Sequence, residues 1–204
     1  MKYKWLSKNK SDKLIIFFNG WGMDEIIVSR LDTEDYDVVV LYDYNNLNLD
    51  IDLSQYREKH VVAWSMGVMV ATLFNFGKLK TKTALCGTPY TVDDEYGIPE
   101  KIYNLTLRTF SEKTVQKFME RMFLNKPETE KFSNRELESL KTELEKMAEY
   151  KPNNGYKYTK SIVADSDVII PVKNQKNFWR DSFELIHSGH CPFENYKSWS
   201  EIIG

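Results

Sequence analysis

The sequence has few cysteines and no long hydrophobic run. Two cysteines, Cys86 and Cys191, in 204 residues do not make a disulfide scaffold, so we expect both to be free thiols. The first hydrophobic run, Leu14 to Phe18, is far too short for a signal sequence or a membrane span. We therefore expect a cytoplasmic protein with no membrane partner.

The chain also lacks an excess of positive charge, since its formal net charge is -2. Binding to a phosphate backbone usually needs a broad positive field, so we expect no nucleic-acid partner. The hydrophobic fraction of 42% and the aromatic fraction of 14% are typical of a chain that folds around a core. The length fits one domain, residues 1–204.

Six short apolar runs, each followed by turn residues, predict strands. Continuous apolarity is typical of parallel strands that are covered on both faces. Residues 24–31 and 66–76 can form helices, so strand and helix alternate. This alternation predicts an α/β fold with a compact, mostly parallel sheet flanked by helices. The predicted strands are 13–18, 37–42, 60–63, 82–86, 161–164 and 183–187.

The alternation stops between about residues 88 and 158, where helical patterns replace the apolar runs. Ser111 can cap one helix, and the run from Ser133 to Glu136 fits a capping box before another. We expect this stretch to be a helical lid inserted into the sheet and not a second domain.

Residues 61–67 have the pattern of a strand, a tight turn and the start of a helix, with Ser65 at the turn. Such a turn pushes a nucleophile out of the carboxyl end of the sheet, and small residues two positions before and after relieve crowding. Gly67 supplies the second small residue, and Ala63 stands where the pattern G-x-S-x-G has glycine. On this motif alone, Ser65 could equally be a helix cap.

A serine nucleophile needs a base to take its proton and an acid to orient that base. His60 begins the strand of the serine and lies at the wrong end, whereas His187 and His190 follow the last predicted strand; we favour His190 over His187. Asp165 and Asp167 both follow an earlier strand, and either could form an Asx turn. The order serine, aspartate, histidine is that of α/β-hydrolases.

The loop Gly20-Trp21-Gly22 follows the strand predicted at 13–18. Its glycines free the backbone to aim an N–H at a developing oxyanion, and Met66 N–H can supply a second donor. A tight turn without this role is the simpler alternative. A dinucleotide-binding motif is excluded because Glu25 stands where the third glycine would be.

Four segments together resemble the pimeloyl-acyl-carrier-protein methyl ester esterases of biotin synthesis, most closely the BioG type of the α/β-hydrolase superfamily. They are residues 18–23, 63–67, 167–171 and 189–193.

The resemblance implies a serine carboxylesterase of the α/β-hydrolase fold with the catalytic residues Ser65, Asp167 and His190. In related esterases the acid precedes a D-x-x-V/I-P run, which selects Asp167 over Asp165. The histidine precedes a small residue, a proline and a phenylalanine, which selects His190.

The resemblance also implies that the backbone amides of Trp21 and Met66 form the oxyanion hole, supported by Gly20, Gly22 and Gly67. Many α/β-hydrolases have histidine before the first glycine of this loop, where Asn19 stands here. Because the donor is a backbone group, this change need not abolish catalysis.

The implied substrate is a pimeloyl chain, methylated at its far carboxyl and carried as a thioester on acyl carrier protein, and no cofactor or metal is implied. Such carriers are acidic, so a basic docking face is expected. From Lys101 to Lys126 there are six basic residues against two acidic ones. A merely solvated face is an equal alternative for each residue. The predicted docking residues are Arg108, Lys113, Lys117 and Arg121.

A helical projection places Lys113, Lys117 and Arg121 on one face, opposite Phe118 and Met122, which could line an acyl tunnel.

Three alternatives stay open. Another ester or thioester hydrolase could use the same fold, because the triad does not set the substrate. The chain could also be a non-catalytic scaffold that binds an acyl ligand or a protein partner. Chemistry at Cys86 or Cys191 is the least favoured, since buried cysteine is commonly an apolar filler. The sequence does not indicate an oligomeric state.

Overall fold

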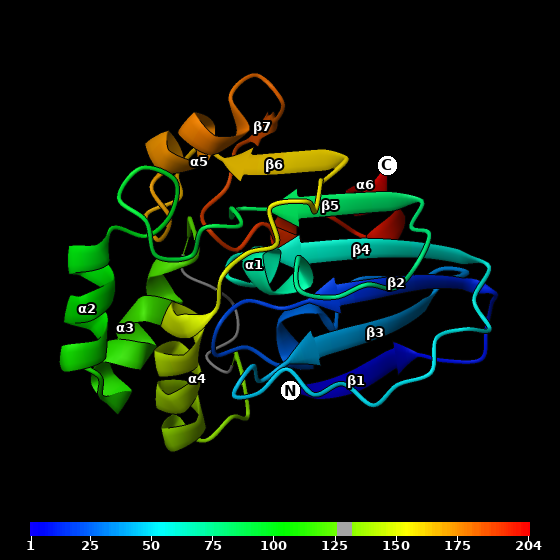
Figure 1. Cartoon of the computed structure of the whole chain (residues 1–204), viewed down its shortest axis with the longest axis horizontal. Coiled ribbons are helices and arrows are strands. Elements are labelled where there is room, and N and C mark those ends of the chain that lie inside the picture. Colours follow the sequence, from blue (N-terminus) through cyan, green and yellow to red (C-terminus); the bar gives the residue numbers. More distant parts are fainter. Residues whose placement is uncertain (126–131) are drawn as a thin grey trace.

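A seven-stranded sheet runs through the computed structural model, which describes residues 1–125 and 132–204 (Figure 1). The strand order is β1-β3-β2-β4-β5-β6-β7. Neighbouring strands are parallel, except that β1 pairs antiparallel with β3. The strands are β1 (Lys2–Ser7), β2 (Lys13–Phe18), β3 (Asp37–Tyr42), β4 (Glu58–Trp64), β5 (Thr81–Leu85), β6 (Lys160–Ala164) and β7 (Glu184–Ile186).

All six predicted strands are confirmed within one or two residues at each end. The edge strand β1 was not predicted from the sequence. Lys2 and Lys4 interrupt its apolar residues, and only Ser7 of this strand is buried. A solvated antiparallel edge strand carries little of the continuous apolarity that marks the buried parallel strands.

The helices are shorter or more numerous than the patterns predict. The segment 24–31 forms only one short 3-10 helix, and 66–76 forms a helix of five residues. Four further helices, at residues 100–108, 172–179, 193–195 and 199–203, were not predicted because they are short or strongly polar. The full set is η1 (Glu25–Val28), α1 (Gly67–Ala71), α2 (Glu100–Arg108), α3 (Glu112–Arg121), α4 (Leu137–Glu149), α5 (Val172–Trp179), η2 (Phe193–Asn195) and α6 (Trp199–Ile203).

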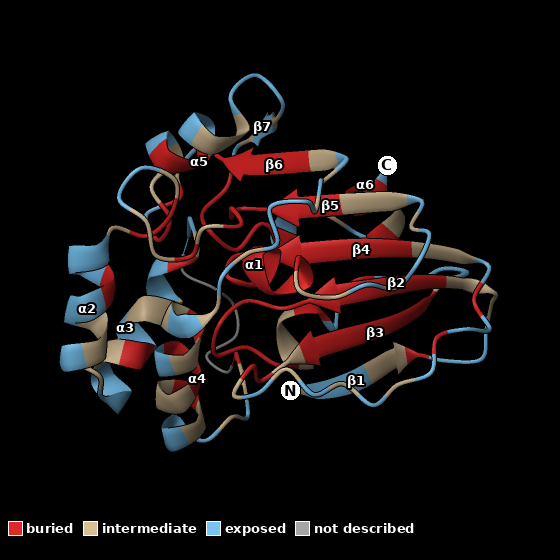
Figure 2. Ribbon diagram, in the orientation of Figure 1, coloured by how far each residue is buried: buried red, intermediate tan, exposed pale blue. Residues whose placement is uncertain are grey.

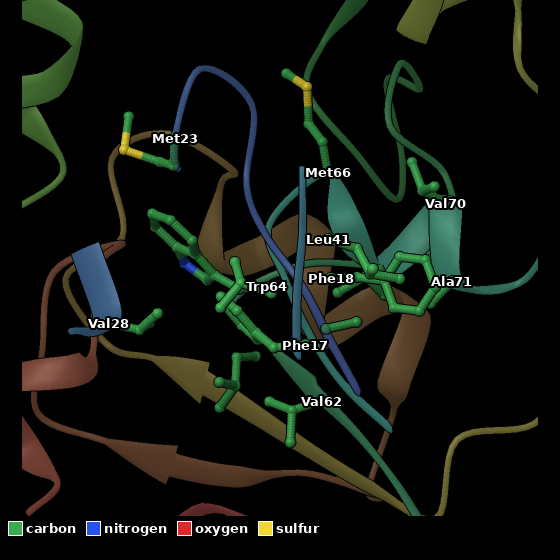
Figure 3. Packing of buried hydrophobic residues seen from close by; sticks show 14 of the residues in the cluster. Phe17, Phe18, Met23, Val28, Leu41, Val62, Trp64, Met66, Val70 and Ala71 are labelled. Atoms are coloured by element: carbon green, nitrogen blue, oxygen red, sulfur yellow. The ribbon is translucent and has the colours of Figure 1, made fainter. Parts of the chain in front are cut away.

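The core lies on both faces of the sheet, and β2 shows why. Side chains alternate along a strand, so Phe17 and Phe18 point to opposite faces. The Phe17 ring packs edge-on against Trp199 of α6, at 5.1 Å between ring centroids, and the Phe18 ring lies 5.5 Å from Phe74, just after α1. The strands are accordingly buried while the outer helices are exposed (Figure 2), and Figure 3 shows this core around Phe17, Phe18 and Trp64.

The three helices α2, α3 and α4 lie in the chain between β5 and β6, within the stretch where a helical insertion was predicted. They gather beyond the carboxyl ends of the parallel strands (Figure 1). Loops at this end carry the reactive groups of open α/β sheets. The insertion therefore stands next to the place where the candidate site residues converge, and its role as a lid stays a prediction.

Of the two predicted helix caps, one is confirmed and one is wrong. Ser111 Oγ accepts a hydrogen bond from Thr114 N at 3.3 Å, and Thr114 Oγ1 accepts one from Ser111 N at 2.9 Å. The run from Ser133 does not cap α4, whose first flanking residue is Glu136. Ser133 Oγ instead accepts from Arg135 N, so the serine stabilises a turn before the helix begins.

Gly67 allows the turn after β4 to pack against the loop after β2. A Cβ on Gly67 would lie 2.4 Å from the carbonyl oxygens of Phe18 and Asn19. Backbone atoms cannot move aside as a flexible side chain can. Ala63, two residues before the serine, is a buried residue of β4 and accommodates its methyl group.

Gly67→Ala and Ala63→Gly should therefore differ sharply in stability. We expect Gly67→Ala to lower the free energy of unfolding by at least about 2 kcal/mol through steric overlap. Ala63→Gly should cost only about 1 kcal/mol, from lost packing and greater chain entropy. Urea unfolding of both variants measures the difference, and equal losses would contradict this account of the turn.

Candidate active site

Ser65 occupies the turn between β4 and α1 in a conformation that its residue type rarely adopts. Its φ angle is +57°, in the left-handed region. Ser65 N donates to Leu85 O at 2.9 Å, and Ser65 O accepts from Val68 N at 3.1 Å, so both sides of the residue are held. A non-glycine residue in this region is strained, and such strain persists only where the surroundings fix it.

The structure brings three predicted site residues together in one chain of hydrogen bonds. His190 Nε2 lies 2.7 Å from Ser65 Oγ, and His190 Nδ1 lies 2.7 Å from Asp167 Oδ2. All three residues are buried. They come from the turn after β4, the loop after β6 and the loop after β7, all at the carboxyl end of the sheet. Such an arrangement can pass a proton from a serine hydroxyl to an imidazole that a carboxylate orients.

Both oxygens of the Asp167 carboxylate are held by hydrogen bonds. Oδ1 accepts hydrogen bonds from Ile169 N at 2.8 Å and Ile170 N at 3.0 Å, as in an Asx turn. Oδ2 accepts from Gln175 Nε2 at 2.8 Å as well as facing His190. The turn that the sequence offered as an alternative role for Asp167 is therefore real, and it fixes the carboxylate toward the histidine.

The remaining candidates from the sequence lie elsewhere. His187 is exposed and pairs with Asp165, at 2.9 Å from Nδ1 to Oδ2, away from the serine. His60 lies near the amino end of β4 between Glu58 and Thr81. Burial lowers the pKa of His60, with Glu58 opposing the shift. Neither histidine is in contact with Ser65.

Two residues that sequence reasoning missed support this arrangement. Trp64 Nε1 donates to the carbonyl oxygen of His190 at 2.8 Å, and the two rings lie 5.5 Å apart. Gln175 of α5 is fully buried and bonds both Asp167 and Ile170 O. The tryptophan beside the serine was visible in the motif, but nothing local indicated its partner 126 residues away. The sequence around Gln175 carried no signal.

The loop after β2 leaves one backbone amide free at the serine. Asn19 N, Gly20 N, Gly22 N and Met23 N each donate a hydrogen bond, whereas Trp21 N has no acceptor among the described residues. Buried backbone amides are almost always paired, so this one is available to a partner outside the chain, such as a ligand or a water molecule.

Met66 N, directly after the serine, likewise has no acceptor in the part of the chain that the structure describes. Gly20, directly before Trp21 in the chain, lies close to Ser65. A Cβ on Gly20 would lie 3.2 Å from Ser65 Cβ and 2.9 Å from the Trp64 ring. Free donors beside a nucleophile can hold a developing oxyanion.

Asn19 replaces the histidine that many α/β-hydrolases carry, and its contacts explain how the loop keeps its shape. Asn19 Oδ1 accepts from Gly20 N at 2.9 Å, and Nδ2 donates to Asp24 O at 2.7 Å. The side chain thus closes the loop on itself. The loop therefore keeps its shape without a histidine at this position.

A small cavity of about 60 Å³ is lined by Trp21 and Met66 together with residues of the inserted helices. Its walls are mainly apolar, and Ile102 and Val168 are more than half exposed, so they carry the apolar surface outward. Apolar pockets with few polar groups are typical of ligand sites. The other lining residues are Ile98, Tyr103, Thr106, Phe118, Arg121, Leu144 and Ile169.

The predicted arrangement of α3 is partly wrong. Phe118 lines the cavity, but so does Arg121, whose Nη2 donates to Val168 O at 3.3 Å. Positions three apart lie side by side on a helix, so the two residues share a wall. Met122 does not line the cavity; its carbonyl accepts from Cys191 N at 2.8 Å in the histidine loop.

The remaining predicted docking residues, Arg108, Lys113 and Lys117, are exposed on α2 and α3. They lie on the outer surface and do not line the cavity. Lys126, the last member of the basic run, lies outside the described residues.

No group of three or more metal-ligating side chains occurs in residues 1–125 and 132–204. In the same residues, no helix is long and apolar enough to cross a membrane.

The chain matches the family described as "Pimeloyl-ACP methyl esterase BioG" over residues 1–202. The chain belongs to the BioG family. A protein of Haemophilus influenzae described as "Uncharacterized protein" is 34% identical over 204 residues, which cover 95% of each chain. The crystal structure of BioG from Haemophilus influenzae superposes with a TM-score of 0.92 at 33% identity and covers 100% of both chains.

A longer protein is similar to this chain over part of its length. The malonyl-[acyl-carrier protein] O-methyltransferase of Bacteroides fragilis is 37% identical over 177 residues, which are 81% of this chain and 36% of that protein. More distant structures share the fold. A thermophilic esterase from Thermogutta terrifontis has a TM-score of 0.61 at 15% identity, over 95% of this chain and 88% of that one. The predicted α/β-hydrolase fold and the resemblance to BioG esterases are both confirmed.

The two thiols should be inert in the folded protein. Burial raises the pKa of Cys191 to about 12 and raises that of Cys86 well above its usual value, with the Asp167 charge adding to the effect at Cys86. Only the thiolate reacts, and a raised pKa leaves little thiolate at neutral pH. Burial also keeps the alkylating reagent away from both sulfur atoms.

Iodoacetamide at about pH 8, near the ordinary thiol pKa, should modify neither cysteine in buffer and both in urea. Intact-protein mass spectrometry counts the adducts, and the urea sample is the control. An adduct on the folded protein would revive the alternative of cysteine chemistry.

Proposed function

We propose that this chain hydrolyses the methyl ester of a pimeloyl chain carried on acyl carrier protein, in biotin synthesis, with Ser65, His190 and Asp167 as a catalytic triad. The observation that carries this proposal is the buried Ser65–His190–Asp167 hydrogen-bond chain beside two unpaired amides. Membership of the BioG family supports the substrate, because that family is described by this reaction.

In the first half of the proposed reaction, His190 Nε2 takes the proton of Ser65 Oγ as the oxygen attacks the ester carbonyl. The carbonyl oxygen becomes negative and accepts hydrogen bonds from Trp21 N and Met66 N. Asp167 holds His190 in the tautomer with its proton on Nδ1 and stabilises the imidazolium that forms. The tetrahedral intermediate then collapses, and methoxide leaves as methanol with the proton from His190.

In the second half, a water molecule attacks the acyl group on Ser65. His190 takes one proton from the water and returns it to Ser65 Oγ as the acyl–oxygen bond breaks. The products are free serine and a carboxylic acid at the end of the chain. The same five groups serve both halves, so the site needs no cofactor for this chemistry.

The cavity supports an acyl substrate that enters as a thin chain. It is lined by Trp21 and Met66, the residues of the two proposed oxyanion donors, and by Phe118, Leu144 and Ile169. Such walls favour methylene groups and offer few partners to polar ones. The exposed Ile102 and Val168 extend the apolar surface toward solvent, where the rest of a carrier-bound substrate would lie.

A carrier-bound substrate is further supported by the Bacteroides relative. Its name describes methyl transfer to a malonyl group on acyl carrier protein. A methyl ester carried on the same kind of protein is the substrate class that the BioG description also names.

Ser65→Ala should abolish ester hydrolysis, with kcat lowered at least about 10⁴-fold because no covalent intermediate can form. The measurement is release of methanol from purified pimeloyl-carrier methyl ester, with circular dichroism as the control for folding. A Ser65→Ala enzyme as fast as the unaltered one would refute the proposed mechanism.

The substrate is tested separately. Turnover of carrier-bound pimeloyl methyl ester should exceed that of short free esters in kcat/KM. Equal turnover of both would favour a general ester hydrolase, and failure of a fluorophosphonate to label Ser65 would favour a non-catalytic scaffold.

Reversing the charge of the α3 surface, defined by Lys113 and Lys117, should weaken carrier binding without lowering the rate of ester hydrolysis. We expect Lys113→Glu/Lys117→Glu to raise KM for the carrier-bound ester about tenfold, because exposed charges steer an acidic partner and set its affinity. The kcat for a short free ester should stay unchanged, since neither lysine lines the cavity.

The matched control is Lys4→Glu/Lys78→Glu, which makes the same change of net charge at two exposed positions, on β1 and before β5. Added salt should raise KM for the unaltered enzyme and reduce the difference between the variants. If both double variants raise KM equally, net charge and not the α3 surface is responsible.

A further inference from the structure

Glu143 of α4 is a fully buried carboxylate outside the proposed triad. Burial raises its pKa, while Arg135 and the amides of Tyr44 and Gly22 oppose the shift. Leu140, Leu144 and Met147 already supply the apolar face of this helix, so packing alone does not need an acid here. A buried carboxylate is costly unless donors surround it.

Three donors converge on this carboxylate from three different segments. Gly22 N donates to Oε2 at 3.1 Å, Tyr44 N donates to Oε1 at 2.7 Å, and Arg135 Nη1 donates to Oε2. Gly22 belongs to the loop after β2, and Tyr44 follows β3. Glu143 thus ties the insertion to the carboxyl ends of two neighbouring strands, next to which α4 lies in Figure 1.

The contact with Gly22 falls one peptide from the free amide of Trp21. A second tether comes from the same helix, because Trp21 Nε1 donates to Leu140 O at 2.9 Å. A third is indirect, since Tyr44, whose amide Glu143 holds, donates its hydroxyl to Asn19 O at 3.0 Å. The loop is therefore fixed on both sides of Trp21 N, and Glu143 takes part in two of these three attachments.

We propose that Glu143 is a positioning residue that holds Trp21 N in the orientation needed to stabilise an oxyanion at Ser65. This inference rests on the proposed function, which assigns Trp21 N to the oxyanion hole. It makes α4 part of the catalytic apparatus and not only a cover over it. Helix α4 must then stay in place during the reaction, whatever α2 and α3 do.

A glutamine in place of Glu143 cannot accept all three of these hydrogen bonds. Its side chain would offer one acceptor oxygen and one NH₂ group to three donors, so at least one backbone amide would face another donor. An aspartate keeps the charge but is one methylene shorter, so it cannot reach both loops.

Glu143→Gln and Glu143→Asp should each lower kcat about 10- to 100-fold with KM changed less than about twofold, because a misplaced oxyanion donor acts in the transition state. The assay uses a short free ester as well as the carrier-bound ester, each normalised to the Ser65 fraction that a fluorophosphonate labels at completion. The rate of that labelling should fall with kcat, since the phosphoryl oxygen needs the same donors.

The control is Asp43→Asn. Asp43 belongs to the same buried network, through Arg135 Nη2 at 3.1 Å and Lys2 Nζ at 2.8 Å, but among the described residues it touches none of the Gly20–Gly22 loop. This variant should lower the unfolding temperature and leave kcat within about twofold of the unaltered enzyme. A purely structural network predicts instead that neither residue changes kcat per folded molecule.

Unaltered kcat and labelling rate in a folded Glu143→Asp or Glu143→Gln enzyme would overturn the proposal. Equal losses of kcat in Asp43→Asn would overturn it too, since the effect would then belong to the whole network. The proposed substrate can fail independently: the short ester and the probe still test Glu143 if the carrier-bound ester is not hydrolysed. An unaltered enzyme that neither hydrolyses esters nor reacts with the probe would refute the proposed function and, with it, the role of Glu143.

Discussion

The Ser65 turn packs closely against the loop after β2, and this contact constrains the backbone on both sides of the candidate site. Gly67 sits against the carbonyl oxygens of Phe18 and Asn19, and Gly20 sits against Ser65 from the other side. Two backbones at this distance leave no room for side chains between them. Gly20 directly precedes Trp21, whose amide has no acceptor among the described residues, and Ser65 on the other side of the contact has a φ of +57°. The strained serine and the loop with the unpaired amide therefore meet at one packing contact.

The other half of the site depends on hydrogen bonds that fix side chains from behind. Asp167 is oriented by two backbone amides and Gln175, and the backbone of His190 is oriented by Trp64. Trp64 also belongs to β4, the strand that ends at the serine. Trp64, whose indole N–H holds the His190 backbone, is the last residue of β4 and directly precedes Ser65 in the turn, which limits how far Ser65 and His190 can move apart.

The fold and the main site residues could be predicted because they depend on local patterns. Ser65 lies on a recognisable turn, and Asp167 and His190 follow strand ends that parallel pairing brings to the same edge of the sheet. Choosing Asp167 over Asp165 needed the family resemblance, because both follow the same strand. The structure gives each aspartate its own histidine.

The features that sequence reasoning missed are contacts between distant segments. Gly22 and Glu143 are 121 residues apart, and no local pattern in either segment indicates the other. The wrong placement of Arg121 has a related cause. A helical projection gives the angle of a residue about its own axis but not which neighbour the helix turns toward, and here that neighbour is the loop at Val168. Edge strand β1 was not predicted because most of its side chains are not buried, so it lacks the continuous apolar run of the buried strands.

The inserted helices are attached to different parts of the candidate site. Helix α4 is joined to the sheet by Glu143, by the Trp21 ring and by Tyr150, whose hydroxyl donates to Tyr44 O at 3.0 Å. Helices α2 and α3 supply Ile102 and Phe118 to the cavity wall and present the exposed lysines of α3. Phe118 of α3 packs against the Trp21 ring, at 5.0 Å between ring centroids, and Met122 O accepts from Cys191 N at 2.8 Å, so changes on α3 can also reach the loops of the site. In the proposed mechanism, changes that loosen α4 would reach the oxyanion through Trp21 N, because one peptide separates that amide from the contact of Glu143 at Gly22.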